Sequence, residues 1–424
     1  MSQQMLDLTK QMISFKSLSR QELPLARFLS DLLRKEHIPH TLDEFDPGQY
    51  MDPRTTQPNT ANLYVDIGSG DDALMLYAHI DVVKGPGELF VPRIEGPKLL
   101  GRGTSDMKTA AAGLMHVLLT NYEALSQTDK RLIFAFIADE ENAATGIKRF
   151  VDVYQPQQIG NLNCVLMEPT NDFAHVNRGG RGYVFFDLEG KMKDVLATLQ
   201  RVYAAKKGLL EQYPDKGDDF GLASLELTKV NCDVGIPGNA YIQKGVSCHA
   251  SRPYQGENAL EKALATGEDI TYLVTTIDEN ANSLPSQAHY LVGDKKYAGR
   301  QCKAHIDLRT NLAASDAEAL KQQVIGLIGD GVNYSIRDEG SAFEVESPEL
   351  IGVCTGAVDS RVEIKVALGG SDAPYLLPLT SNVVCGFGPG DLAVCHTDKE
   401  YVNLSAVDLT PQVVQRMIDN FHNI

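Results

Sequence analysis

The feature that most constrains the fold of this chain is the alternation of apolar runs and helix-like segments over its first 170 residues. Four short, largely apolar runs end in polar or glycine-rich turns, at 63–67, 73–78, 132–138 and 163–167. Helical spacing of apolar residues recurs at 4–16, 21–36 and 107–120. Strands buried on both faces and separated by helices predict an α/β fold, an α/β/α sandwich around a mixed, largely parallel sheet.

The pattern changes after residue 178. A long helix-like segment, several short alternating stretches and a second helix follow, at 193–213, 223–230, 240–247, 302–309 and 316–328. From about residue 345 the chain returns to longer apolar runs. A chain of 424 residues exceeds the usual size of a single core. We therefore expect one domain built from 1–178 plus 345–424, interrupted by a smaller α+β domain at 179–344.

Composition excludes several classes of partner. The formal net charge of −17 argues against a nucleic-acid surface or an anionic membrane surface, because both need a cationic footprint. No apolar run approaches the roughly 20 residues of a membrane span, and the first residues lack the pattern of a signal peptide. The seven cysteines are scattered and form no C-x-x-C pair, which favours reduced thiols. These features predict a cytoplasmic protein.

Acidic and imidazole side chains gather at the ends of the predicted strands. Three of the four apolar runs are followed closely by such residues: His79 and Asp81, Glu140 and Glu141, and Glu168. In open α/β sheets the ligand crevice lies outside the carboxyl ends of the strands. We therefore expect these side chains to meet at one edge of the sheet, near Asp106 in a glycine-rich loop.

Each of these residues also has a simpler explanation. A histidine at a strand end is often structural, Asp106 could be a helix N-cap, and paired acids are usually solvated. If the carboxylates converge, however, they repel one another and lose hydration, so a cationic partner is required. Imidazoles and carboxylates without a thiolate suit zinc, cobalt or manganese. In the His79-x-Asp81 pair, the carboxylate would accept the imidazole N–H and fix its tautomer.

Seven strings occur in a fixed order along the chain: YAHIDVV, GRGTSDMK, DEE, MEPT, CHASRPYQGENA, GGSDAPYL and VCHTDKEY. This series resembles the signature of the dinuclear zinc aminoacylase and carboxypeptidase family. That family includes acetylornithine deacetylase, succinyl-diaminopimelate desuccinylase, glutamate carboxypeptidase and several di- and tripeptidases. The resemblance spans most of the chain and places the protein in amino-acid metabolism.

The resemblance implies two divalent metal ions, most simply zinc. One would be held by His79, Asp106 and Glu168, and the other by Asp106, Glu141 and His396, with Asp106 bridging. Asp81 would orient His79, and Glu140 would be the general base that takes a proton from water and delivers it to the leaving amine.

The resemblance also assigns roles within and beside the smaller domain. His249 would stabilise the oxyanion across a homodimer interface, and Arg309 would clamp a substrate carboxylate. Gly369, Gly370 and Ser371 would allow close backbone approach to the same end of the substrate. The smaller domain would then act as a lid and a dimerisation domain.

One feature departs from the family pattern. Gly190-Lys191 is separated from His249 by more than fifty residues, whereas the corresponding family motifs are nearly adjacent. The segment 223–237 resembles one usually found after that histidine, yet it precedes it here. The smaller domain therefore has either an altered strand order or an insertion.

Three classes of function remain open from the sequence. The first is a deacylase of N-acetyl or N-succinyl amino acids, and the second is a peptidase of the same family. The third is a nucleotide-binding or non-catalytic protein, but GRGTSDMKT lacks the spacing of a phosphate-binding loop. Glu168 resembles the deacylases and carboxypeptidases, and with Arg309 it favours substrates with a free carboxylate and a blocked amine. We prefer the deacylase, with the peptidase as the alternative.

Overall fold

The structure is a computed structural model that describes residues 2–50, 60–153, 159–213, 223–248, 250, 253–275, 284–310, 312, 314–367 and 370–423. The chain divides into two compact units. The first unit comprises Met1–Gly179, Glu344–Ala367 and Ser371–Ile424. The second comprises Gly180–Phe343 together with Leu368–Gly370.

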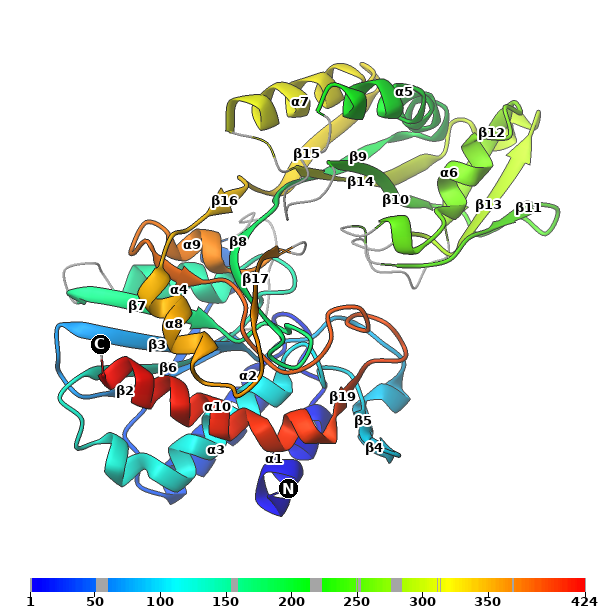
Figure 1. The fold of residues 1–424 in the computed structure, drawn as a ribbon. Helices are drawn as coiled ribbons and strands as arrows, with labels where there is room; N and C mark the ends of the chain where they lie inside the picture. Colours follow the sequence, from blue (N-terminus) through cyan, green and yellow to red (C-terminus); the bar gives the residue numbers. More distant parts are fainter. Residues whose placement is uncertain are drawn as a thin grey trace. The chain divides into compact units, whose positions relative to one another are not determined.

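A six-stranded sheet forms the centre of the first unit (Figure 1). Its order is β1 (Thr41–Phe45), β2 (Thr60–Ile67), β6 (Arg131–Ile137), β3 (Asp72–His79), β7 (Asn161–Leu166) and β18 (Asn382–Val384). Strands β6, β3, β7 and β18 are parallel, whereas β1–β2 and β2–β6 are antiparallel. The predicted α/β fold with a mixed, largely parallel sheet is therefore confirmed.

Helices cover this sheet. They are α1 (Gln3–Ser14), α2 (Leu23–Lys35), α3 (Lys108–Leu125), α4 (Thr145–Val153), α8 (Pro348–Thr355), α9 (Ala373–Leu376) and α10 (Leu404–His422). Helices α1, α3 and α10 pack against one another, and α3 also contacts β3. On the other side of the sheet, α4 contacts β2 and α9 (Figure 1). Within the described ranges, the chain forms no helix with the length and apolar character needed to cross a membrane.

The apolar runs of the sequence explain why the central strands are buried on both faces. Every residue of β3 after Asp72 is buried, and β6 is buried from its second residue onward. Two smaller sheets have the orders β19–β5–β4 and β16–β8–β17. Their strands are β4 (Arg93–Glu95), β5 (Lys98–Leu100), β19 (Tyr401–Asn403), β8 (His175–Gly180), β16 (Phe343–Glu344) and β17 (Glu363–Ala367).

The second unit contains a four-stranded antiparallel sheet with the order β10–β14–β9–β15. Its elements are β9 (Gly182–Lys191), α5 (Met192–Glu211), β10 (Ser224–Cys232), β14 (Gln301–Thr310), α7 (Ala314–Gly326) and β15 (Val332–Gly340). This β-α-β-β-α-β succession with the first and third strands central is the ferredoxin-like arrangement.

An insertion separates β10 from β14 in the sequence. It contains β11 (Tyr241–Lys244), α6 (Ala259–Leu264), β12 (Ile270–Thr275) and β13 (Gln287–Val292). These strands form their own sheet, in the order β11–β13–β12. The long spacing between Gly190-Lys191 and the following motif therefore reflects helix α5, strand β10 and an insertion, and the four-stranded sheet keeps a regular strand order.

The insertion shares one hydrophobic core with the four-stranded sheet. Alternate residues of β14, among them Ala304, Ile306 and Leu308, face the same core as Leu199 of α5. Tyr272 of the insertion is also part of this core and fully buried. The insertion is thus packed onto the second unit rather than tethered to it.

A buried polar cluster joins the insertion to α5 and β10. The ammonium group of Lys206 donates to Glu226 at 2.7 Å and to Glu261 at 3.0 Å. Burial raises the pKa of Glu226 from its ordinary value of 4.5 to about 7, and repulsion from Glu261 adds to the rise. One lysine therefore does not fully compensate the buried carboxylate of Glu226 and the partly buried carboxylate of Glu261.

We predict that the substitution Glu226→Gln reduces the loss of stability as pH rises from about 4.5 to 7. Because folding raises the pKa of Glu226, its stabilising contribution is complete below its unfolded pKa and is lost as pH rises through the folded value. The wild-type free energy of unfolding should fall by roughly 1–3 kcal/mol more than that of the variant across this window.

Urea denaturation followed by circular dichroism would measure this difference, since the chain contains no tryptophan for fluorescence. The matched control is Glu211→Gln, because Glu211 is a solvent-exposed glutamate on α5. Equal pH slopes for wild type, Glu226→Gln and Glu211→Gln would contradict the prediction.

Candidate metal centre

The carboxyl ends of three parallel strands carry the predicted acidic and imidazole side chains. His79 is the last residue of β3, Glu140 and Glu141 lie in the turn that follows β6, and Glu168 comes two residues after β7. Asp106 precedes α3, whose N-cap position is held by Met107 without a side-chain hydrogen bond. The simpler explanation of Asp106 as a helix N-cap is therefore wrong.

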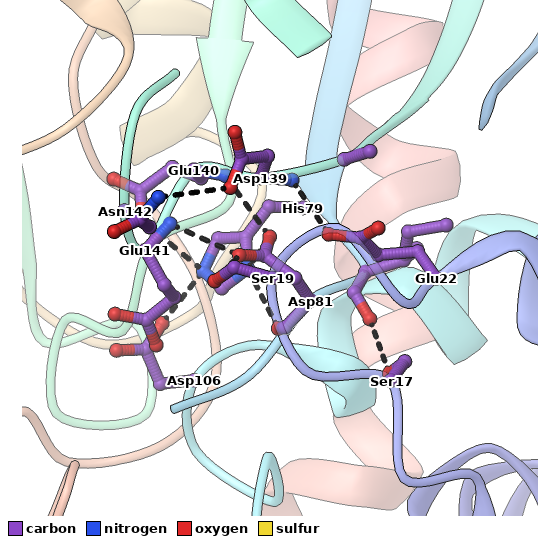
Figure 2. A network of polar contacts seen from close by, with 12 residues as sticks. Ser17, Ser19, Glu22, His79, Asp81, Asp106, Asp139, Glu140, Glu141 and Asn142 are labelled. Atoms are coloured by element: carbon purple, nitrogen blue, oxygen red, sulfur yellow. Dashed lines mark hydrogen bonds and ion pairs between the residues drawn. The ribbon is translucent and has the colours of Figure 1, made fainter. Parts of the chain in front are cut away.

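The carboxylate of Asp106 lies between two imidazoles. Its Oδ1 is 2.9 Å from Nε2 of His79, and its Oδ2 is 3.2 Å from Nε2 of His396. Nε2 of His396 is also 3.0 Å from Oε1 of Glu141. Figure 2 shows Asp106, His79 and Glu141 turned toward one another. One potential ligand atom from each of these three residues lies within 4.8 Å of the other two.

Two further carboxylates belong to the same cluster. Oε1 of Glu168 is buried and has no hydrogen-bond partner among the described residues. Burial raises the pKa of Glu168 well above its ordinary value, and nearby Asp106 and Glu141 raise it further. Oε2 of Glu140 lies 3.9 Å from Nε2 of His79, and burial likewise raises the pKa of Glu140.

The imidazoles supply the positive charge that this cluster needs. Burial acts to lower the pKa of His396, but Glu141 and Asp106 outweigh it and raise the pKa to about 10. The pKa of His79 is also raised, because hydrogen bonds to Asp106 and Asp81 outweigh burial. Burial acts to raise the pKa of Asp106, but hydrogen bonds to His396 and His79 lower it. The donor set and the orphaned oxygen of Glu168 fit divalent cations, which would replace these protons.

Asp81 contacts His79 and the turn that carries Glu140 and Glu141. Nδ1 of His79 is 3.1 Å from the backbone oxygen of Asp81 and 3.4 Å from its Oδ1. The carboxylate of Asp81 also accepts the backbone N–H groups of Glu140 at 3.0 Å and Glu141 at 3.1 Å (Figure 2). The hydroxyl of Ser19 donates to it at 2.8 Å. Asp81 thus positions both glutamates as well as the imidazole.

A second acidic cluster, formed by Glu22, Asp81 and Asp139, lies next to these residues. Oε1 of Glu22 accepts the backbone N–H groups of Arg20 at 2.6 Å and Asp139 at 3.0 Å, and the hydroxyl of Thr60 donates to Oε2. Burial and nearby Asp81 raise the pKa of Glu22 to about 8. Asp139 has a left-handed φ of 59°. Glu22 therefore holds the start of the turn that carries Glu140 and Glu141.

Glu400 holds the loop that carries Asp106. Its Oε1 accepts the backbone N–H groups of Ser105 at 3.1 Å and Asp106 at 3.2 Å, while Oε2 pairs with buried Arg102. His396, in the same string VCHTDKEY, has a left-handed φ of 65°. Glu400 was not among the predicted site residues, although it lies within that string.

Asp372 is a second residue that the sequence analysis missed. The hydroxyl of Tyr77 donates to its Oδ2 at 2.6 Å, which ties the start of α9 to the end of β3. Both side chains are buried. Burial raises the pKa of Asp372 to about 7, and the bond from Tyr77 offsets part of that rise. Its position directly after GGS in the string GGSDAPYL is the signal that could have identified it.

The predicted substrate arginine lies in the second unit, within a cluster of aromatic and charged residues. Arg309 donates from Nε and Nη2 to the two carboxylate oxygens of Asp307, at 2.7 and 3.0 Å. Its guanidinium carbon lies 4.8 Å from the ring centroid of Phe185. A Cβ added to Gly370 would lie 3.9 Å from Nη1 of Arg309 and 3.9 Å from Cε1 of Tyr183. The structure thus brings together Arg309 and Gly370.

Of the other residues predicted to contact the substrate, the structure describes Ser371. The hydroxyl of Ser371 accepts the backbone N–H of Ala373 at 3.4 Å, at the start of α9. His249 and Gly369 lie outside the described residues.

Sequence comparison finds relatives for most of this chain. The profile of peptidase family M20/M25/M40 matches residues 75–420. A succinyl-diaminopimelate desuccinylase from Pelagibacter ubique (strain HTCC1062) is 28% identical over 265 residues, which cover 55% of this chain and 65% of the relative. The match therefore spans less than two thirds of that relative's length.

Solved structures share the fold. The di-peptidase Dug1p from Saccharomyces cerevisiae superposes with a TM-score of 0.68 at 11% identity, covering 99% of this chain and 96% of its own. An M20 family metallo-carboxypeptidase from Sulfolobus solfataricus gives a TM-score of 0.63 at 10% identity, with both chains fully covered. At such identities the likeness establishes the fold alone.

We predict that zinc binding at pH 7 releases protons from this centre. The raised pKa values of His79 and His396 keep both imidazoles protonated without metal, and a ligand must lose its proton to bind. Calorimetric titration in two buffers of different ionisation enthalpy should show roughly two or more protons released per chain, because the pKa of Glu168 is raised as well. The apparent affinity should rise with pH.

The substitution His396→Ala should reduce both the proton release and the metal stoichiometry. The control is His37→Asn, since His37 is exposed and lies between α2 and β1. Stoichiometric metal binding without any proton release at pH 7 would contradict the assignment of the two histidines as ligands.

Proposed function

The chain belongs to peptidase family M20/M25/M40, and from this premise we propose that it is a metal-dependent hydrolase that deacylates an N-acetyl or N-succinyl amino acid. The observation that carries the proposal is the position of Asp106. Its two oxygens face different imidazoles, at 2.9 and 3.2 Å. A carboxylate so placed is suited to bridge two cations.

The proposed ligands divide into two sets that share Asp106. His79, Asp106 and Glu168 would hold one ion, and Asp106, Glu141 and His396 would hold the other. We propose zinc in both positions, with cobalt or manganese as alternatives, because the donors are imidazoles and carboxylates without a thiolate. When bound, such ions supply Lewis acidity to an amide carbonyl and lower the pKa of a water molecule.

Glu140 is the proposed general base. Its carboxylate lies near His79. Its backbone N–H donates to the carboxylate of Asp81 at 3.0 Å, which fixes the position of the backbone from which the side chain extends. Burial raises the pKa of Glu140, which favours a group that accepts a proton and then releases it. In the proposed reaction Glu140 takes the proton of water and delivers it to the nitrogen of the leaving amine.

The second unit is proposed to recognise the carboxylate end of the substrate. Asp307 occupies the Nε and Nη2 donors of Arg309, so a substrate carboxylate would approach the Nη1 side, where Gly370 leaves room. We also propose that this unit serves as lid and dimerisation domain, and that His249 of a homodimer partner stabilises the oxyanion. Cytoplasmic location is part of the same proposal.

A peptidase is the alternative, since the family whose profile matches residues 75–420 is named for peptidases. The structural neighbours include a di-peptidase and a metallo-carboxypeptidase, both of which cover nearly the whole chain. The desuccinylase similarity, by contrast, comes from sequence matches at 23–32% identity. Both substrate classes contain an amide bond near a free carboxylate, so substrate trials must separate them.

The first experiment loads the protein with zinc or cobalt and offers N-acetyl amino acids, N-succinyl amino acids, dipeptides and tripeptides. We expect mass spectrometry to show release of an acyl acid, and we expect Glu140→Gln to lower kcat by about 100-fold or more, because proton transfer is lost. Cleavage confined to peptides would establish the alternative. Stoichiometric metal binding with no amide hydrolysis would contradict both substrate classes.

We further predict that Arg309→Lys raises KM about 10-fold for a substrate with a free carboxylate, but not for the matching carboxamide. Lysine keeps the charge but loses the planar fork that also holds Asp307. Steady-state kinetics on the two substrates would measure the difference. Arg337→Lys is the control, since Arg337 also stacks on Phe185, at 5.0 Å. An equal rise in KM for both substrates would argue against carboxylate recognition by Arg309.

A further inference from the structure

Two cysteines face each other across the antiparallel pair β10–β14. Cys232 is the last residue of β10, and its register partner is Cys302, the second residue of β14. The next pair outward is joined by a hydrogen bond of 3.0 Å from the backbone N–H of Asp233 to the oxygen of Gln301. Hydrogen-bonded and non-hydrogen-bonded pairs alternate in such ladders. Cys232 and Cys302 therefore occupy a non-hydrogen-bonded position.

This position suits a disulfide bond. Opposite residues in a non-hydrogen-bonded pair have Cα atoms about 4.5 Å apart, and their side chains project from the same face. Disulfides span Cα separations of about 4.4–6.8 Å. Burial raises the pKa of the Tyr272 hydroxyl, and negative charge on Cys232 or Cys302 raises it further.

We propose that Cys232 and Cys302 form a reversible disulfide within one chain when a low-molecular-weight disulfide such as oxidised glutathione is present. The two sulfur atoms mark the neck of the insertion, since β11, α6, β12 and β13 all lie between them in the sequence. The bond would tie together the points at which the insertion leaves and rejoins the four-stranded sheet.

Exposure assigns the order of the two steps. Cys232 is partly exposed, whereas Cys302 is 1% exposed and belongs to the core. The thiolate of Cys232 attacks one sulfur of the glutathione disulfide, whose S–S bond breaks to release one glutathione thiolate. Cys302 then loses its proton and attacks the Cys232 sulfur of the mixed disulfide, expelling the second glutathione. Two protein thiols are oxidised, one glutathione disulfide is reduced, and the two protons pass to the two glutathiones.

The surroundings of the pair make this exchange slow. Burial raises the pKa of Cys302 to about 12, with Cys232 and Asp233 adding to the rise. Burial also raises the pKa of Cys232. The thiolate is the attacking species, so little of it is present at neutral pH. The pair would therefore respond to sustained oxidation rather than to a brief pulse.

The test uses the full chain incubated with oxidised glutathione, or with dithiothreitol, at about pH 8 to populate the thiolate. Trypsin digestion without reduction should yield the peptide Val230–Lys244, VNCDVGIPGNAYIQK, joined to Gln301–Lys303, QCK. Its mass should be the sum of the two peptides less two hydrogens, and dithiothreitol should abolish it. Crosslinking of a long loop should also raise the unfolding midpoint by a few degrees.

Variants separate this pair from other thiols. Cys302→Ala should leave Cys232 as a stable mixed disulfide with glutathione and remove the rise in midpoint. Cys248→Ser removes another partly exposed cysteine and should leave the joined peptide intact. The readouts need no catalytic assay, so they do not depend on the proposed function.

Three outcomes would overturn the proposal. In the first, the wild type accumulates glutathione on Cys232 without forming the joined peptide. In the second, the joined peptide occurs only in covalent dimers on a non-reducing gel. In the third, both thiols stay fully reduced after prolonged oxidation while Cys248 is modified.

Discussion

Repulsion among buried carboxylates at one edge of the central sheet is the constraint on which the first unit depends. Burial raises the pKa of Glu140 and Glu168, and neighbouring acids raise it further. The pKa of Asp106 is instead lowered, because it lies between two imidazoles whose hydrogen bonds outweigh burial. A fold that keeps such groups together must bind cations or protons there, and it must hold the backbone against the repulsion.

The carboxylates that surround the site meet the second requirement largely through backbone N–H groups, and Glu400 also pairs with buried Arg102. Asp81 holds the N–H groups of Glu140 and Glu141, Glu22 holds that of Asp139, and Glu400 holds that of Asp106. A buried carboxylate that accepts such bonds is stabilised locally and fixes the loop at the same time. The geometry of the metal centre is thereby set by segments from opposite ends of the chain.

The sequence predicted the parts of this arrangement that leave a periodic or terminal signal. Largely apolar runs located β3, β6 and β7, and polar residues after those runs located His79, Glu141 and Glu168. Glu22, Glu400 and Asp372 left no periodic or strand-end signal, because the residues that they hold near the site lie far away in the sequence. Glu400 bonds to the N–H of Asp106 across 294 positions, and spacing carries no information about such a pair. The sequence also could not show whether the smaller domain contains an insertion or an altered strand order. Both would place the motif of His249 equally far from Gly190-Lys191.

The regular order of the four-stranded sheet follows from where the insertion enters it. Strands β10 and β14 are antiparallel neighbours, so the chain leaves and re-enters the sheet at adjacent positions, joined by the Asp233–Gln301 hydrogen bond. The cost of closing a loop grows only slowly with its length, so a connection here can lengthen into a whole subdomain without disturbing the ladder. A crosslink between the two strands at this neck closes a loop that contains the entire insertion. It therefore lowers the conformational entropy of the unfolded insertion as a whole. Two facing cysteines at this neck therefore have more leverage on the second unit than the same pair would have elsewhere in the sheet.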